Sequence, residues 1–282
     1  MRRKVLMLLG VFVLLAITVV PAFAVTDGEL DGNGHPAVVL LLMEVDGAPA
    51  FRCSGTLLSP RVLLTAGHCA GEPGEFSGMR VFTESDVQAG IGITNNYPFA
   101  GPNSVEAIDW QAHPAYTSAQ FFLHDVGVVI LAAPGVVLNP SEYGVLPTVN
   151  QFDSLKTRRG QQDKTFTAVG YGLQQSFPDA ASWKEHNTRT RYVAHPYLIQ
   201  INGGIVGNFS LLLSNNAHSG GTCFGDSGGP NFVGSGNSET SVVGGVTSFG
   251  LNGNCAGTGG VFRVDRQNVQ DFIEDFAGAY LP

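Results

Sequence analysis

The sequence predicts an all-β fold, in which two antiparallel β-barrels follow one another along the chain and a single helix comes last. Many short runs rich in Val, Thr, Ile and Phe are separated by turn residues, a pattern typical of antiparallel strands. The 282 residues include 37 glycines and 15 prolines, which favours many turns. A clear helical period appears at the end of the chain.

The candidate strands fall into two groups on either side of a polar stretch at 147–164, which is typical of a linker or an exposed loop. We assign residues 25–150 to the first barrel half and residues 151–264 to the second. The expected strands of the first half are 36–45, 51–65, 79–83, 89–93, 104–109 and 126–132. Those of the second half are 165–171, 189–194, 197–201, 208–213, 230–233, 240–249 and 260–264.

The expected helix lies within the C-terminal segment 265–282. Asp265 is placed to cap its first turn, and Gly278 is a reasonable end. Four apolar residues follow the i, i+3, i+4, i+7 spacing of one helix face: Val269, Phe272, Ile273 and Phe276. This stripe predicts a packing face and implies no chemistry.

Residues 1–24 have the features of a secretory signal peptide. A basic start, Arg2-Arg3-Lys4, precedes the uncharged stretch 5–20, and Ala22-Phe23-Ala24 is a small-x-small cleavage site. The alternative is an uncleaved membrane anchor, but the uncharged stretch is shorter than the roughly 20 residues that a spanning helix needs. We therefore expect a secreted protein with no membrane association after cleavage.

The charge of the chain excludes some partners. The net charge is −8, and removal of the signal segment takes away three cations and no anion, which leaves −11. This balance argues against nucleic acid or an anionic membrane as a partner. The histidines have no spacing that implies a metal site, and the acidic turn at 27–33 lacks the EF-hand pattern. We expect a monomer without metal or cofactor.

The four cysteines indicate two disulfides, since an even number in an exported chain usually pairs. No two of them have C-x-x-C spacing, so a structural zinc site is not expected. Three pairings are possible and the sequence alone does not choose among them. The local pairing, Cys53 with Cys69 and Cys223 with Cys255, is the simplest.

The segment 221–230, GTCFGDSGGP, carries the strongest chemical signal. Glycines around Ser227 let a substrate approach the backbone and leave N–H groups free to face a developing oxyanion. The alternative is a glycine-rich hairpin. Residues 225–229 also match the G-x-S-x-G elbow of α/β-hydrolases, but those enzymes place their histidine after the serine, and no histidine follows Ser227 here.

Two upstream residues could complete a catalytic set. His68 ends the apolar run 62–64 beside Cys69, which suits an imidazole that must be held accurately. Asp125 stands before the apolar run 126–131, where a partly buried carboxylate needs a hydrogen-bonding partner. Alone, each has a purely structural interpretation, a buried histidine and a strand-entry aspartate. The order His, Asp, Ser favours a nucleophilic triad.

The segments TAGHC at 65–69, HDVGVVIL at 124–131 and GDSGGP at 225–230 together resemble the trypsin/chymotrypsin-like serine peptidases, over about residues 25–276. The resemblance implies two packed six-stranded barrels with a triad of His68, Asp125 and Ser227 between them. It implies a serine endopeptidase acting on proteins or peptides. The two local disulfides match two of the family, whereas several further bridges of its animal members have no cysteines here.

The resemblance also implies how the site is completed. The N–H groups of Gly225 and Ser227 would bind the oxyanion. Cleavage after Ala24 would leave Val25-Thr26-Asp27-Gly28, which is similar to the family's mature Ile/Val-x-x-Gly terminus. In that family the new α-ammonium pairs with the aspartate before the nucleophile, here Asp226. We therefore expect no separate propeptide.

Specificity is inferred from the same resemblance. The pocket floor falls on Gly221, where trypsin-like members carry an aspartate, so a preference for Arg or Lys is not expected. The pocket walls fall on Ser248, Phe249, Gly250 and Gly260, and glycines on both sides leave room for a large apolar side chain. The competing hypothesis is a catalytically silent binding protein on the same fold, although such relatives usually lose part of the triad.

Overall fold

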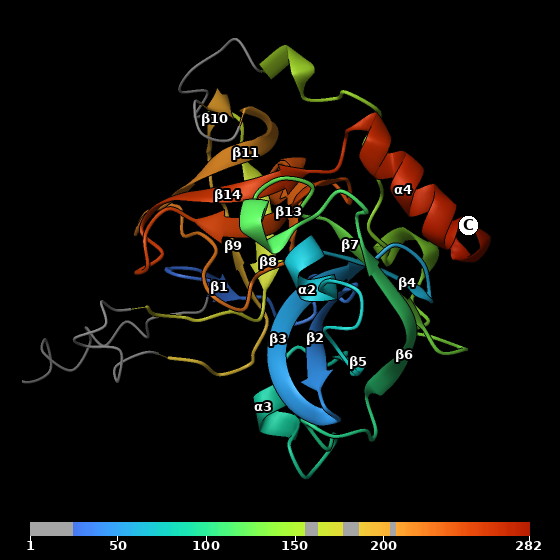
Figure 1. Ribbon diagram of the computed structural model, residues 1–282. Helices are drawn as coiled ribbons and strands as arrows, with labels where there is room; N and C mark the ends of the chain where they lie inside the picture. Colours follow the sequence, from blue (N-terminus) through green and yellow to red (C-terminus); the bar gives the residue numbers. More distant parts are fainter. Residues whose placement is uncertain (1–24, 156–162, 177–185, 204–206) are drawn as a thin grey trace, which may run out of the picture.

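The computed structural model describes residues 25–155, 163–176, 186–203 and 207–282 (Figure 1). The expected signal segment 1–24 and part of the expected loop 147–164 lie outside these ranges. Strands make up most of the regular secondary structure in the described chain, and one long helix lies near the C-terminus, so the predicted all-β class is confirmed. Among the described residues, no helix is long and apolar enough to cross a membrane.

The first unit is a closed six-stranded barrel. Its strands follow the order β2-β3-β4-β7-β6-β5, and each neighbouring pair is antiparallel. They are β2 Val38–Val45, β3 Ala48–Leu57, β4 Val62–Thr65, β5 Gly78–Phe82, β6 Ser104–Ala112 and β7 Gly127–Leu131.

Strand β2 lies between two hydrophobic cores. Successive side chains of a strand point to opposite faces. Val39 and Leu41 join a core cluster made only of first-unit residues, whereas Val38 and Leu40 join a cluster shared with the second unit and the C-terminal helix. The unbroken apolar run is therefore explained by a strand that is buried on both faces.

The second unit is a curled sheet of eight strands, where the resemblance implied a six-stranded barrel. Its order is β1-β9-β8-β12-β13-β14-β11-β10. The bounds are β1 Glu29–Leu30, β8 Phe166–Gly170, β9 Tyr192–Ala194, β10 Leu198–Gly203, β11 Gly207–Asn215, β12 Pro230–Val233, β13 Val243–Gly250 and β14 Gly257–Arg263. Strand β1 comes from the first half of the chain, and Glu29 pairs with Val193, so the start of the described chain is built into the second unit.

Short helical turns connect the strands. They are α2 Gly67–Ala70, α3 Val87–Gly90, and the 3-10 turns at Ser118–Gln120, Pro140–Glu142, Asp153–Leu155, Gly236–Ser238 and Gly278–Tyr280. The expected strand 89–93 is wrong, because Asp86 caps α3 there by accepting from the N–H of Ala89 at 2.9 Å. The expected strand 51–65 is two strands, since Ser59 Oγ accepts from the N–H groups of Arg61 and Val62 in a turn.

Helix α4, Gln267–Ala277, packs its apolar stripe against β7 of the first unit (Figure 1). Its first cap is Arg266 and not Asp265 as expected. Asp265 is instead fully buried, where it pairs with Arg263 at 2.7 Å and accepts from the N–H of Phe152 at 2.9 Å. A buried arginine needs this carboxylate more than an exposed helix end does.

Candidate active site

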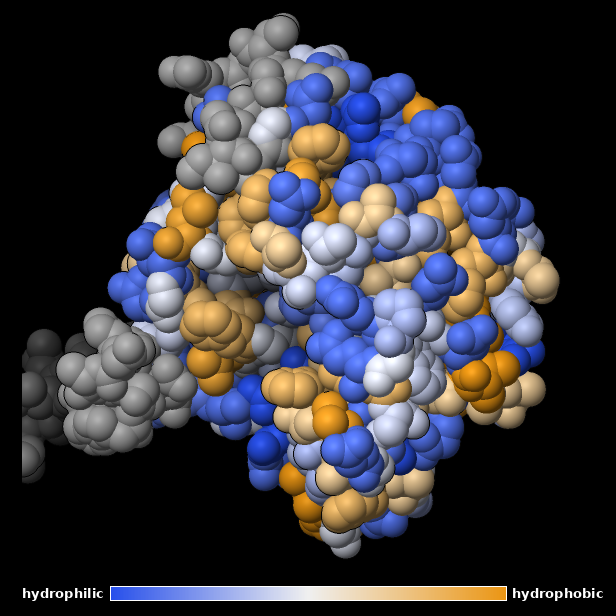
Figure 2. All heavy atoms as spheres, viewed as in Figure 1, coloured by the Kyte–Doolittle hydropathy of each residue, from blue (hydrophilic) through white to orange (hydrophobic). Residues whose placement is uncertain are grey.

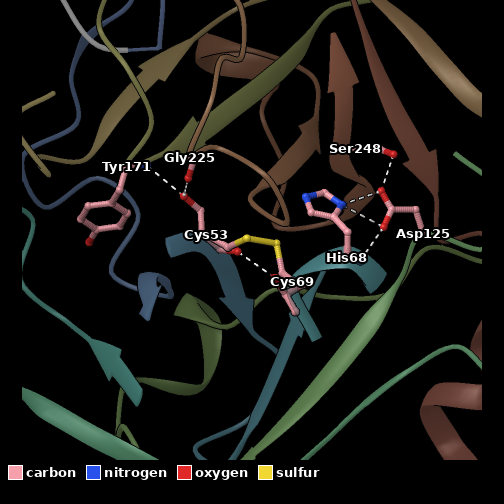
Figure 3. Close-up of a disulfide and its surroundings, with 9 residues drawn as sticks. Cys53, His68, Cys69, Asp125, Tyr171, Gly225 and Ser248 are labelled. Atoms are coloured by element: carbon pink, nitrogen blue, oxygen red, sulfur yellow. Dashed lines mark hydrogen bonds and ion pairs between the residues drawn. A yellow bond between two sulfur atoms is a disulfide. The ribbon is translucent and has the colours of Figure 1, made fainter. Parts of the chain in front are cut away.

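His68 and Asp125 meet because their strands pair. Thr65 at the end of β4 lies opposite Gly127 at the start of β7, so α2 and the residue before β7 lie at the same edge. The N–H of His68 donates to Asp125 Oδ1 at 2.9 Å, and His68 Nδ1 lies 3.0 Å from Oδ2 (Figure 3). The carboxylate accepts from Nδ1–H, which leaves Nε2 as the basic nitrogen.

Asp125 has a further partner that the sequence did not reveal. Ser248 Oγ, on β13 of the second unit, donates to Asp125 Oδ2 at 2.5 Å (Figure 3). The Asp125 side chain is fully buried, whereas 31% of the His68 side chain is exposed. Burial alone would lower the pKa of His68, but the adjacent Asp125 carboxylate outweighs it and raises that pKa.

Two disulfides support the two sides of this region. Cys53 on β3 is bonded to Cys69 on α2, and Cys223 is bonded to Cys255, which is the local pairing. Cys53, His68 and Cys69 form a close group of potential metal-binding side chains in the described chain. Both cysteines are oxidised, so neither offers the thiolate that a metal ligand requires.

Ser227 lies in the loop between β11 and β12 and lines the same pocket as His68, which has a volume of about 410 Å³. Its carbonyl accepts from the N–H of Ser54 at 2.8 Å, which ties the loop to β3. Gly228 has φ +76°, and a Cβ there would lie 2.0 Å from Thr65 Oγ1. Glycine is therefore required for the loop to approach β4 so closely.

The backbone around Ser227 leaves donors available. Among the backbone hydrogen bonds found within the described ranges, none uses the N–H of Gly225 or of Ser227. Gly225 has φ +95°, a conformation that favours glycine. Ser54 Oγ donates to the carbonyl of Gly225 at 3.0 Å and accepts from the N–H of Tyr171 at 2.9 Å (Figure 3). The role of Ser54 was not apparent from the sequence.

Asp226 is a buried carboxylate without a full counter-charge. It accepts from the N–H groups of Gly172 and Cys223, each at 2.8 Å. Burial nevertheless raises its pKa to about 7. Val25 is buried against Tyr192 and Ala194, but within the described part of the chain no contact joins it to Asp226. In the uncleaved chain its nitrogen belongs to a peptide bond and carries no charge.

The residues expected to form the specificity pocket are only partly brought together. Ser248 and Gly250 line the pocket that holds His68 and Ser227, whereas Gly221 and Gly260 are not among its lining residues. A Cβ on Gly260 would lie 2.2 Å from the Phe249 ring, so that ring already covers Gly260. Gly221 lies against the side chain of Asn215 and donates its N–H to Thr26 O at 3.0 Å.

The face that presents α2 is hollowed and partly apolar (Figure 2). Exposed aromatic and aliphatic side chains gather at the Ser227 pocket: Phe121, Phe224 and Leu251. The Phe249 ring contacts Phe121 with a centroid separation of 6.0 Å. This surface offers apolar contacts next to a hydroxyl, an imidazole and two free N–H groups.

The chain is similar in sequence to known proteins. A family model described as Trypsin matches residues 29–273. Phenoloxidase-activating factor 3 of Holotrichia diomphalia is 28% identical over 250 residues, covering 81% of this chain and 65% of that protein. Serine protease Hayan of Drosophila melanogaster is 32% identical over 110 residues, covering 38% of this chain and 16% of that protein. The chain thus spans less than two thirds of the length of both relatives.

A solved structure described as HL collagenase shares the fold. Its TM-score is 0.65 and its sequence identity 21%, over 89% of this chain and 97% of that one. At this identity the similarity concerns the architecture: the barrel, the second sheet and the C-terminal helix.

Proposed function

Since the chain belongs to the Trypsin family, we propose that it is a secreted serine endopeptidase with Ser227 as nucleophile, His68 as general base and Asp125 as the group that orients the imidazole. One observation carries the proposal. The hydroxyl-bearing Ser227 and the imidazole of His68 line one pocket, and the carboxylate of Asp125 holds Nδ1 of that imidazole. A serine is activated when its hydroxyl lies within reach of an imidazole that a carboxylate orients in this way.

The reaction begins when Ser227 Oγ attacks the peptide carbonyl and His68 Nε2 takes the hydroxyl proton. Asp125 stabilises the imidazolium that forms. Collapse of the tetrahedral intermediate breaks the C–N bond, and the same proton passes to the leaving amine. Water then attacks the acyl-enzyme, with His68 again as base, and releases the acid and the free serine.

The N–H groups of Gly225 and Ser227 are the proposed oxyanion donors. Both are unused within the described part of the chain, and Ser54 holds the peptide group that follows Gly225. Fixed donors aimed at developing charge lower the barrier because they need no reorganisation during the reaction.

Activation follows from the buried carboxylate. Cleavage after Ala24 would convert the nitrogen of Val25 into an ammonium group that pairs with Asp226. Two features support this: Val25 is already buried, and Thr26 is already paired with Gly221 beside the Ser227 loop. The raised pKa of Asp226 shows that burial destabilises its charged form, so a nearby cation would stabilise the carboxylate.

The substrate side chain before the scissile bond is proposed to be large and apolar. Gly221 supplies no carboxylate for a basic side chain, and Phe121, Phe249 and Leu251 line the pocket. A large side chain that reaches Gly260 must displace the Phe249 ring, because that ring now covers it. Faster cleavage after Arg than after Phe in matched peptides would refute this preference.

A fluorophosphonate probe tests the enzyme itself. The protein processed to begin at Val25 should be labelled at Ser227, as located by peptide mass spectrometry. Ser227→Ala should abolish the label and His68→Ala should slow it strongly. Ser238, in an exposed turn, provides a matched control, because Ser238→Ala should leave labelling unchanged. No label on the folded wild-type protein would favour the catalytically silent binding protein.

A further inference from the structure

A second pocket, of about 460 Å³, lies beside the end of β2 and the start of β3. It is lined by the guanidinium groups of Arg52 and Arg189 together with Tyr97, Phe51 and neighbouring apolar residues. We call it the Arg52–Arg189 pocket. Placing two positively charged side chains in one partly buried pocket costs free energy, unless an anion binds between them.

The two guanidinium groups are poorly compensated. In each, the Nε atom is buried and has no hydrogen-bond partner. None of the ion pairs found among the described residues involves Arg52 or Arg189. Among the described residues, Arg189 donates to the neutral amide of Gln88 at 2.5 Å and lies over the Tyr97 ring at 5.0 Å.

The surroundings compensate the charge of Arg52 only in part, through a hydrogen bond with Tyr97 and the attraction of Tyr97 and Asp226. Burial lowers the pKa of Arg52, and the like charge of Arg189 lowers it further, against attraction from Tyr97 and Asp226. Asp226 is a carboxylate that attracts Arg52, but both of its oxygens accept backbone N–H groups and it makes no ion pair with the arginine. A guanidinium remains charged under these conditions and keeps donors free for a carboxylate.

The position of the pocket identifies the part of a substrate that reaches it. A Cβ on Gly225 would lie 3.3 Å from Arg52 Nε, so the guanidinium borders the proposed oxyanion loop. Arg52 precedes Cys53, whose disulfide partner follows His68. The Ser227 pocket, in contrast, includes Cys223 and Cys255. Arg52 therefore lines one pocket and borders Gly225, while Ser227 lines the other.

We propose that the Arg52–Arg189 pocket binds an acidic side chain of the substrate, at one of the first three residues after the scissile bond. The inference rests on the proposed endopeptidase function. If the acyl half of a peptide occupies the Ser227 pocket, its leaving half runs toward Arg52. An extended peptide advances about 3.3 Å per residue. A carboxylate within three residues of the scissile bond would therefore reach the Arg52–Arg189 pocket.

Matched peptides test the proposal. They share the acyl half and carry an amidated C-terminus, and each of the three positions after the scissile bond is in turn Glu, Gln or Lys. At one position, kcat/KM for Glu should exceed that for Gln by roughly tenfold to a hundredfold, the range of a charge-assisted hydrogen bond. Lys should be worse than Gln. The Glu-to-Gln ratio should decrease in high salt, because salt screens the attraction between the arginines and the substrate carboxylate.

Substitutions of the two arginines test whether the preference for Glu comes from the Arg52–Arg189 pocket or from the overall charge of the protein. Arg189→Gln should bring the Glu-to-Gln ratio close to one, and Arg189→Glu should favour Lys. Arg52→Lys, which keeps the charge but loses the planar fork, should reduce the ratio partly. Arg266→Gln is the matched control, since that arginine pairs with Asp153 beside α4 and should leave rates and ratio unchanged.

A binding measurement distinguishes this proposal from the enzyme proposal. Ser227→Ala protein and fluorescent Glu or Gln peptides give affinities by anisotropy without any cleavage. Tighter binding of the Glu peptide that is lost in the Ser227→Ala, Arg189→Gln double variant supports the pocket, even if the wild-type protein cleaves nothing. Equal affinities and equal kcat/KM values for Glu and Gln at all three positions would overturn it, even if cleavage is efficient.

Discussion

The histidine that joins the two units should make the stability of this protein fall at alkaline pH. His35 contacts Asp31 through Nδ1 and Glu239 through Nε2, the latter at 2.7 Å. Burial alone would lower the pKa of His35, but the two carboxylates raise it to about 9. The folded state therefore holds this proton more tightly than the unfolded chain, in which the pKa is about 6.5.

The size of the effect follows from that difference. At about 1.4 kcal/mol per pKa unit, a rise from about 6.5 to about 9 is worth at most about 3 kcal/mol. The contribution is fully present below pH 6.5 and is lost as the pH rises through about 9. For a chain of this size such a loss corresponds to a fall in melting temperature on the order of 10 °C.

Denaturant unfolding of the wild-type protein and of His35→Gln, from pH 6 to pH 10, measures the contribution of the His35 proton to stability. Gln cannot carry the proton, so the difference in unfolding free energy between the two proteins should shrink by about 3 kcal/mol across this range. Comparing the proteins removes the titration of other groups, Asp226 included. A difference that stays constant with pH, or one that grows, would show that His35 is not charged between these carboxylates.

Three further predictions concern activity. Ser54→Ala should lower kcat about tenfold with little change in KM, because Gly225 O and the N–H of Tyr171 lose their shared partner; a change in KM alone would contradict a role near the oxyanion. One extra residue before Val25 should leave the protein nearly inactive in peptide cleavage, and full activity there would exclude the Val25–Asp226 pair. The pH dependence of kcat/KM should be bell-shaped: activity falls in acid as His68, with its raised pKa, becomes protonated, and falls in alkali as the Val25 ammonium loses its proton, so a flat profile from pH 5 to 10 would refute both assignments.

Much of the fold could be predicted because its signals are local. The apolar run of β2 and the helical period of α4 each lie within one element, and both were recognised. The strand predicted at 89–93 is wrong, because contacts with residues outside that range determine the local structure. Thr94 and Asn95 donate to the Glu84 carboxylate, and Asp86 caps a helical turn between them.

The candidate site shows the same division. His68, Asp125 and Ser227 each stand in a short recognisable segment, whereas the residues that hold them do not. Ser54 contacts a carbonyl 171 positions away, and Ser248 reaches a carboxylate 123 positions away. A lone serine in a strand carries no sign of such a partner, so these contacts become visible only when the two units are placed together.

The contacts across the units bear on catalysis as well as on stability. Asp125 comes from the first unit, and its partner Ser248 from the second; Ser54 comes from the first, and Gly225 from the second. A small shift between the units would therefore disturb both the imidazole and the proposed oxyanion donors. Arg191 holds the units together by donating to the carbonyl of Val38 on β2 at 2.9 Å. Its buried ion pair with Asp31 at 2.6 Å connects it to His35, which extends the network to Glu239.

This network links the alkaline loss of stability to the site itself. When His35 loses its proton, Asp31 keeps Arg191, but the Glu239 carboxylate loses its cationic partner. The second unit is then held less firmly against the first, and the hydrogen bonds that cross the cleft are the ones that depend on that placement. If this reasoning is correct, His35→Gln lowers kcat at pH 7 but leaves the acid side of the rate profile, which reports His68, unchanged, because the variant affects the position of His68 and not its charge.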